Sequence, residues 1–174
     1  MKSSRIEFII EQNGLTRNQT IGLLKKTPTE LWYRTPEVIQ SNIAWQVGHL
    51  IVSQFYHSIA VITKPDLKIY ADIPLKEYFP IYSMKTKSTI NDLQPSPEVL
   101  LSQLNLMNEY AKHSINSLFD EDLDKALVET KFPHPIAKTK YEALTWSFRH
   151  EMWHLGQIAT LKRILNNPVN WYEK

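Results

Sequence analysis

The sequence contains no cysteine, and this absence excludes several kinds of chemistry. Disulfide bonds, thiolate nucleophiles and cysteine-ligated zinc sites all need that residue. Any thiol that takes part in a reaction of this protein must therefore come from a small molecule. Glycine is also scarce, with four residues in 174, which argues against a sandwich of short strands joined by tight turns.

Long apolar runs and blocks of like charge are missing as well. No segment approaches the roughly 18 apolar residues that span a bilayer, and the apolar run near the N-terminus is too short and too charged for a signal peptide. Acidic and basic side chains nearly cancel, with a formal charge of +2 when the histidines are neutral. We therefore expect a cytoplasmic protein that binds neither nucleic acid nor membranes. Its length predicts a single domain over residues 1–174.

Four long segments carry apolar residues at helical spacing. They cover approximately residues 4–26, 42–63, 96–118 and 139–165. Serine and proline at the start of the third segment suit a helix N-terminus, and the fourth opens with the capping-box pattern Thr139 to Glu142.

Two long connections separate these segments, at residues 64–95 and 119–138. Both contain prolines and aromatic residues, which is typical of ordered loops that cover a functional site. The pattern as a whole predicts an all-α fold: a four-helix bundle with long ordered loops after helices 2 and 3.

The segment "RHEMWHLGQ", residues 149–157, carries the clearest chemical signal. His150 and His154 lie about 40° apart on a helix, so their rings can converge on one ion. Glu151 completes the letters H-E-x-x-H of zinc proteases, in which the glutamate acts as general base. A peptidase is disfavoured, because few residues follow His154 to supply a third ligand and no predicted strand could align a peptide.

A third histidine, His49, is expected on the apolar face of the second helix. Trp45 and Tyr56 share this face and are candidate contacts to a substrate. A buried imidazole without a partner costs about 2 kcal/mol, and a shared metal ion would satisfy all three rings. The alternative is that all three are ordinary core histidines. Of the other histidines, His57 is expected at the periphery of the bundle and His113 on the surface. His134 is expected in a loop that could approach the site.

Two segments, "WQVGHL" and "HEMWHLGQIATL", resemble the DinB superfamily. Its members are four-helix-bundle proteins similar to metal-dependent enzymes of the bacillithiol-transferase type. The likeness covers most of the chain in helix order and loop placement, but its specific part is small.

The resemblance implies that His49, His150 and His154 hold one divalent ion, with zinc, nickel and manganese as candidates. Gln157 belongs to the same pattern, and we expect it to shape the site by bonding a ligand histidine or another helix. Glu151 is a candidate base or hydrogen-bond acceptor beside the ligands.

Polar residues interrupt the apolar face of the first helix. One interpretation is that they line a pocket, in which Arg17 would hold a substrate carboxylate. The alternative is that Gly14 breaks the helix and rotates its face. The residues concerned are Asn13, Arg17 and Thr20.

Three imidazoles leave a metal ion its full charge and an open position, where it can activate a water or a thiol. We therefore expect a metal-dependent transferase or hydrolase that acts on a small molecule, with a low-molecular-weight thiol as candidate cosubstrate. The alternatives are a non-catalytic metal- or small-molecule-binding bundle and a purely structural one. A second apolar stripe on the last helix, opposite the histidines, should be covered by a long loop or by a second subunit, and we favour a homodimer. It consists of Phe148, Met152, Leu155 and Ala159.

Overall fold

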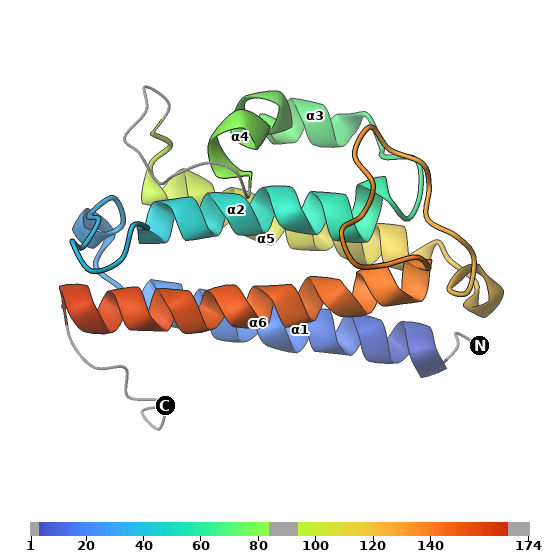
Figure 1. Cartoon of the computed structure of the whole chain (residues 1–174), viewed down its shortest axis with the longest axis horizontal. Coiled ribbons are helices and arrows are strands. Elements are labelled where there is room, and N and C mark those ends of the chain that lie inside the picture. Colours follow the sequence, from blue (N-terminus) through green and yellow to red (C-terminus); the bar gives the residue numbers. More distant parts are fainter. Residues whose placement is uncertain (1–3, 84–93, 167–174) are drawn as a thin grey trace.

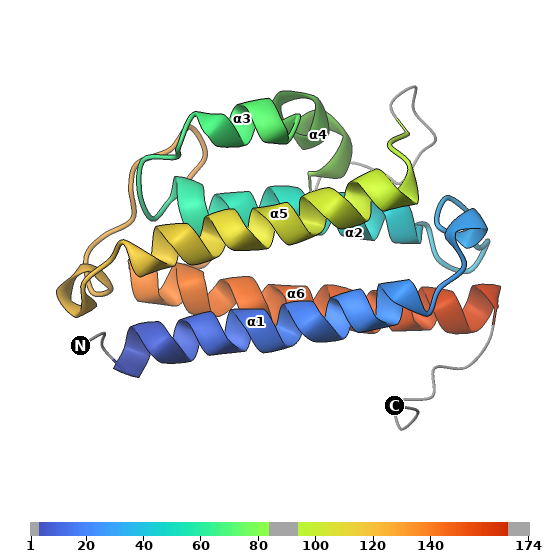
Figure 2. The same ribbon diagram turned by 180° about the vertical axis from the view of Figure 1, so that it is seen from behind.

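A computed structural model describes residues 4–83 and 94–166 of the chain. Apart from one isolated β-bridge, between Ala126 and Thr139, the regular secondary structure of these residues is helical. Four long helices run side by side (Figures 1 and 2): α1 (Ser4–Lys25), α2 (Ile43–Phe55), α5 (Pro97–Asn116) and α6 (Lys140–Leu165). The prediction of an all-α four-helix bundle is confirmed.

Helix ends lie close to where local signals place them. The Ser96 hydroxyl accepts a hydrogen bond from the N–H of Val99 at the start of α5, and the capping box of Thr139 and Glu142 forms at the start of α6. The second predicted helix is divided in two. Its last turn widens into the π-helix η2 (Tyr56–Ala60) before the chain leaves the bundle.

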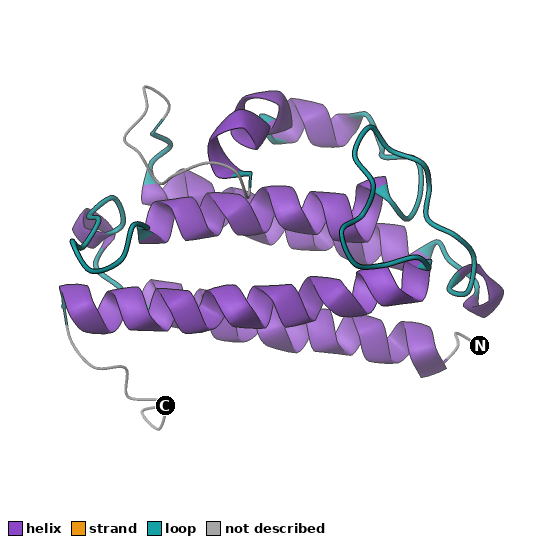
Figure 3. Cartoon of the chain, viewed as in Figure 1, coloured by secondary structure: helices purple, strands orange, loops and turns teal. Residues whose placement is uncertain are grey.

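Over their described parts, the long connections consist of loops and short helices (Figure 3). The first contains two short helices, α3 (Lys68–Asp72) and α4 (Leu75–Tyr82), which lie on the side of α2 and α5 that faces away from α1 and α6. The second begins with the short 3₁₀ helix η3 (Asp120–Asp122) and then reaches past the end of α2. A further 3₁₀ turn, η1 (Thr29–Leu31), follows α1.

Because of these additions, α2 is enclosed on all sides. Twelve of its 13 residues are buried, and Trp45 is the half-buried exception. Polar residues on α2 are therefore buried at every angle around the helix. A helical wheel, in which one face of a helix meets water, would place some of them on the surface.

The apolar stripe of α6 is partly covered within the chain. Leu155 is buried, and Phe148 packs edge-on against Phe8 of α1 with ring centroids 6.3 Å apart. Met152 keeps 45% of its surface exposed. The homodimer stays a prediction, as does the single domain over the whole chain. Among the described helices, none is both long and apolar enough to cross a bilayer.

Candidate metal centre

Three histidine side chains meet in the interior of the bundle. His49 comes from α2, and His150 and His154 come from successive turns of α6. The Nε2 atom of His150 lies 3.4 Å from that of His49 and 3.2 Å from that of His154. All three rings are buried. The structure thus brings together the three residues that the sequence singled out as ligands.

Hydrogen bonds on the outer edges of two rings decide which nitrogen faces the centre. Nδ1–H of His49 donates to the carbonyl of Tyr82 at 2.7 Å, and Nδ1–H of His154 donates to Oε1 of Gln46 at 2.5 Å. Since a neutral imidazole carries one hydrogen, the Nε2 atoms of both rings keep their lone pairs.

Burial keeps the three imidazoles neutral. It lowers the pKa of His49, and burial together with the neighbouring His49 lowers the pKa of His150 to about 4. The pKa of His154 is lowered in the same direction, chiefly by burial. Neutral imidazole is the form that binds metal ions, so the rings are in the ligating state at neutral pH.

The geometry of the nitrogens fits a small divalent ion. Zinc–nitrogen bonds of about 2.0–2.1 Å in a tetrahedral site place two ligand nitrogens about 3.3–3.4 Å apart. The observed separations of 3.2 and 3.4 Å match this spacing. Without a cation, the Nε2 lone pairs of His49 and His154 both face the ring of His150. This ring has one hydrogen, which can satisfy at most one of them. These three residues form a group that could hold a metal ion.

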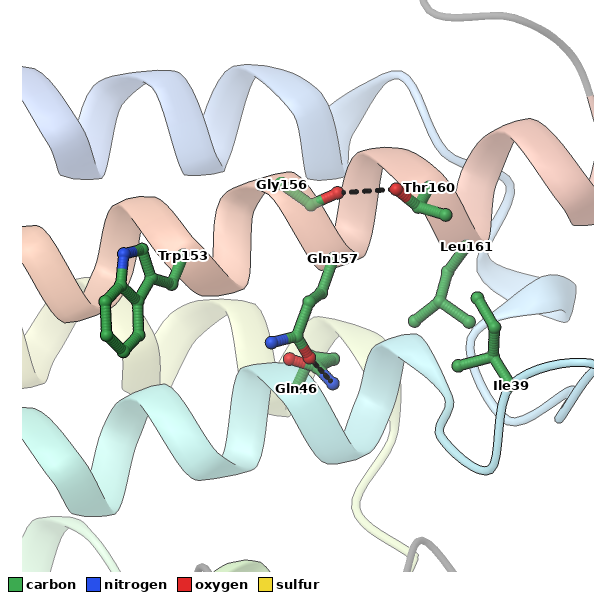
Figure 4. A pocket seen from close by; sticks show the side chains of 7 residues that line it. All are labelled: Ile39, Gln46, Trp153, Gly156, Gln157, Thr160 and Leu161. Carbon is green, nitrogen blue, oxygen red and sulfur yellow. Dashed lines mark hydrogen bonds between the residues drawn. The ribbon is translucent and has the colours of Figure 1, made fainter.

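Gln157 acts on this group through another side chain. Nε2–H of Gln46 donates to Oε1 of Gln157 at 2.9 Å and to the hydroxyl of Ser41 at 2.8 Å, while its Oε1 accepts from His154. Figure 4 shows the two facing amides of Gln46 and Gln157. Of the two roles expected for Gln157, the geometry gives it the bond to another helix. Sequence reasoning missed Gln46, although it stands only three residues before His49.

Gly48, the residue before His49, allows Tyr82 to lie close to α2. A Cβ atom built on Gly48 would lie 2.5 Å from the ring of Tyr82, which is closer than carbon atoms can approach. The absence of a side chain therefore lets Tyr82 pack directly on α2, and this contact brings the Tyr82 carbonyl to His49. Sequence reasoning had no means of finding this ligand support, because a main-chain carbonyl has no sequence signature.

The two predicted aromatic contacts lie near the site in different ways. The ring of Trp45 stacks on His49, with centroids 5.0 Å apart and planes at 8°. Tyr56 stacks instead on His134, at 5.6 Å and 9°, and its hydroxyl donates to the carbonyl of Phe132. Trp45 thus contacts a candidate ligand directly, whereas Tyr56 holds the long loop.

The expectation that His57 lies at the periphery is wrong. It is 7% exposed, and its ring packs against that of His150 with centroids 5.4 Å apart. Because the loop before α6 packs on η2 through His134, a rotation away from His49 does not carry His57 into water. His134 approaches the site through the loop and bonds His57 at 2.8 Å. His113 is exposed, as expected.

Arg17 and Glu151, the candidates for binding a substrate carboxylate and for a base or acceptor beside the ligands, form a buried ion pair. Arg17 is 2% exposed, and its Nε and Nη2 donate to the two carboxylate oxygens of Glu151 at 2.8 and 2.9 Å. Nη2 also donates to Gln54, and Nη1 donates to the carbonyl of Leu104. Glu151 therefore faces Arg17, because it lies about 100° from His150 around the helix. Arg17 on α1 thus bonds residues of the other three long helices: Glu151 on α6, Gln54 on α2 and Leu104 on α5.

The structure also excludes the alternative that Gly14 breaks the first helix and rotates its face. Helix α1 continues through Gly14 without a break, so its polar positions keep their inward orientation. Asn13 and Thr20 are buried along with Arg17.

A cleft of about 230 Å³ opens beside the bonded amides of Gln46 and Gln157. Figure 4 shows the amide nitrogen of Gln157 turned away from its bond with Gln46. The other residues around the cleft are largely apolar: Ile39, Trp153, Gly156, Thr160 and Leu161.

Comparisons with known proteins agree with this fold. The family model described as the DinB superfamily matches residues 12–158. A crystal structure of a conserved protein from Enterococcus faecalis superimposes with a TM-score of 0.59 at 15% sequence identity, covering 95% of this chain and 98% of that one. At this identity the likeness shows the fold alone. None of the curated proteins matches the chain.

Proposed function

The chain belongs to the DinB superfamily, and from that premise we propose that it is a metal-dependent enzyme that transfers a small thiol to an electrophile. The proposed ligands are His49, His150 and His154. The observation that carries the proposal is the convergence of their Nε2 atoms at 3.2 and 3.4 Å. A divalent ion held by three neutral imidazoles would lower the pKa of a bound thiol or water.

The protein's own groups would orient the ligands and exclude water. The Tyr82 carbonyl and the Gln46 amide hold two of the rings in the ligating tautomer. Trp45 covers one face of His49. Because the chain has no cysteine, the thiol must be a cosubstrate.

The position of Glu151 favours thiol transfer over hydrolysis. A metal-activated water in an H-E-x-x-H site relies on the glutamate as general base. Here both carboxylate oxygens of Glu151 accept hydrogen bonds from Arg17, in the interior of the bundle. A thiol is far more acidic than water, so it needs less help from a base.

The cleft between α2 and α6 supports a small, largely apolar substrate. Trp153, Ile39 and Leu161 offer apolar contact, and the amide nitrogen of Gln157 offers hydrogen-bond donors to an acceptor atom. The bonds from Gln157 through Gln46 to His154 connect this cleft to the proposed metal.

One observation favours a second candidate, a metal-binding protein without turnover. The three histidines are only 4–8% exposed, so a substrate would have little access to an ion among them. The two functions differ in a measurable way, because a closed site binds metal but consumes no thiol.

Metal content tests the proposal first. Protein free of affinity tags is incubated with zinc, nickel and manganese together, desalted and measured by inductively coupled plasma mass spectrometry. We expect about one ion per chain in the wild type and in the exposed-site control His113→Ala, and near-complete loss in His150→Ala/His154→Ala. Zinc and nickel should outcompete manganese, because imidazole ligands favour them.

Turnover is tested next on protein loaded with the metal that binds. Consumption of a small thiol in the presence of an alkylating electrophile should require the ion and should disappear in the double variant. A wild-type protein that stays empty after the metal incubation would rule out the metal site. Stoichiometric metal without thiol consumption or hydrolysis of model esters and amides would favour the binding protein.

We also propose that a second copy covers the exposed part of the apolar stripe on α6. Met152→Glu should then shift the molecular mass measured by light scattering from dimer to monomer. A monomeric wild type would contradict this.

A further inference from the structure

Two histidines outside the proposed ligand set form a pair beside it. His57 comes from the π-helical turn η2, and His134 comes from the long loop before α6. Nδ1 of His57 lies 2.8 Å from Nε2 of His134. Since the ring of His57 also packs against that of His150, the pair connects the ligand group to the loop.

The hydrogen bonds around His134 determine where its own hydrogen lies. Its Nδ1 accepts from the main-chain N–H groups of Ile136, at 3.2 Å, and Ala137, at 2.8 Å. An accepting nitrogen carries no hydrogen, so the neutral ring holds its hydrogen on Nε2. This is the atom that faces His57, and it therefore donates.

The tautomer of His57 follows from the same reasoning. Its Nδ1 accepts the hydrogen bond from His134, so its single hydrogen lies on Nε2. His49 and His154 have the opposite arrangement, with the hydrogen on Nδ1 and the lone pair on Nε2. His57 thus stands next to the ligand rings as a hydrogen-bond donor.

The local structure holds this donor in place. The Tyr56 ring stacks on His134, its hydroxyl donates to the Phe132 carbonyl, and the N–H of Val128 donates to the carbonyl of Val61 at the end of the turn. These contacts fix the loop on η2, and π-helical turns are frequent at functional sites. Because Nδ1 of His57 bonds the loop, the hydrogen on Nε2, one ring carbon away, is directed away from His134. The hydrogen bond that the described residues show for this ring is the one between Nδ1 and His134.

We propose that His57 donates its Nε2–H to an acceptor atom of the small molecule bound at the three-histidine group, and that His134 positions it. The molecule must offer an anionic or lone-pair atom, such as a thiolate, carboxylate or carbonyl oxygen. This inference rests on the proposed function, because it assumes that a small molecule binds there.

The tautomers can be measured without metal or substrate. Long-range ¹H–¹⁵N correlation spectra of the uniformly ¹⁵N-labelled protein, at a pH where the rings are neutral, distinguish the two nitrogens of each ring. We expect the hydrogen on Nε2 of both His57 and His134. In His134→Ala, the resonances of His57 should shift toward a mixture of tautomers, whereas His113→Ala should leave them unchanged. A hydrogen on Nδ1 of His57 in the wild type would overturn the proposal.

The donor role is tested with azide as the anionic probe on cobalt(II)-loaded protein, by visible absorption. Losing a hydrogen bond to a charged group should weaken azide binding on the order of 10-fold in His57→Phe. His57→Gln, which keeps an N–H donor at a similar reach, should recover part of that loss. His134→Ala leaves the ring of His57 in place and should weaken binding by a smaller factor.

The outcomes separate the two proposals. Equal azide affinity in the wild type and His57→Phe, with cobalt bound in both, would overturn the role of His57 and leave the metal site standing. Failure of the wild type to take up cobalt would refute the metal site itself, and with it the donor role.

Discussion

The buried ion pair between Arg17 and Glu151 allows a demanding test of how this bundle is held together. The change Arg17→Met keeps much of the aliphatic length of the side chain and removes its charge. Four donor interactions disappear: two to the Glu151 carboxylate, one to Gln54 and one to the carbonyl of Leu104. Both charged side chains are at most 5% exposed, so water cannot replace the lost partner.

The expected cost is large because a carboxylate is left buried without a countercharge. Removing one partner of such a pair costs about 3–5 kcal/mol of unfolding free energy. For a chain of this size, each kcal/mol shifts the melting temperature by about 2–4 °C, so the expected decrease is about 6–20 °C. Replacing both partners, as in Arg17→Met/Glu151→Leu, should restore most of the loss, since an apolar pair of similar volume needs no charge compensation.

Urea unfolding monitored by tryptophan fluorescence measures these differences, and Arg163→Met serves as an exposed control on α6. The double variant should be more stable than Arg17→Met alone. A loss below about 1 kcal/mol in Arg17→Met would refute the assignment of the pair as a structural element. So would Glu151→Gln if it kept full stability and metal but lost turnover, because the carboxylate would then act as the base of an H-E-x-x-H site.

Three further changes test the support of the site and the start of α6. Gln46→Leu should weaken zinc binding by about 10–100-fold in a chelator competition, because His154 loses the acceptor that fixes its tautomer; unchanged affinity would contradict this. Gly48→Ala should lower stability by about 1–3 kcal/mol in urea, since its methyl group collides with the buried ring of Tyr82; Gly156→Ala, which meets nothing within 4 Å, is the control. Two main-chain N–H groups lower the pKa of the Glu142 carboxyl, so its contribution to stability is present above pH 4.5 and is lost as the pH falls through the lowered value. Glu142→Gln should reduce stability at pH 7 and flatten this acid dependence, and an unchanged pH profile would refute the capping role.

Local signals in the sequence account for the helices and for two of the three candidate ligands. Ser96 and Thr139 mark helix starts because a side-chain oxygen satisfies N–H groups within three residues along the chain. His150 and His154 face one point because they are four residues apart on a helix, whatever surrounds them. His49 was placed by the apolar face of its helix and by family resemblance, and the tertiary structure brings it within reach of the other two.

Such local signals do not predict the exposure of a side chain where a helix is covered on more than one side. His57 was assigned to the periphery because its angle on the helix was taken from a bundle with four helices only. The structure adds α3, α4 and the loop before α6 around α2 and η2, so polar residues such as His57 become buried whatever their angle. Arg17 was expected to bind a substrate because it is a polar residue on the apolar face of its helix. No sequence pattern reveals its partner Glu151, which lies 134 positions further along the chain.

The sequence by itself determined that this chain forms a helical bundle with two histidines on one face of its last helix, since both properties depend on spacing within a few residues. The tertiary structure alone decided what surrounds those histidines: the Tyr82 carbonyl, the Gln46 amide and the pair of His57 with His134. Each of these contacts joins residues more than 30 positions apart, and their formation depends on how complete helices and loops pack together. The positions of main-chain carbonyls and the tautomers of histidines also cannot be deduced from residue types, so only the folded structure reveals them.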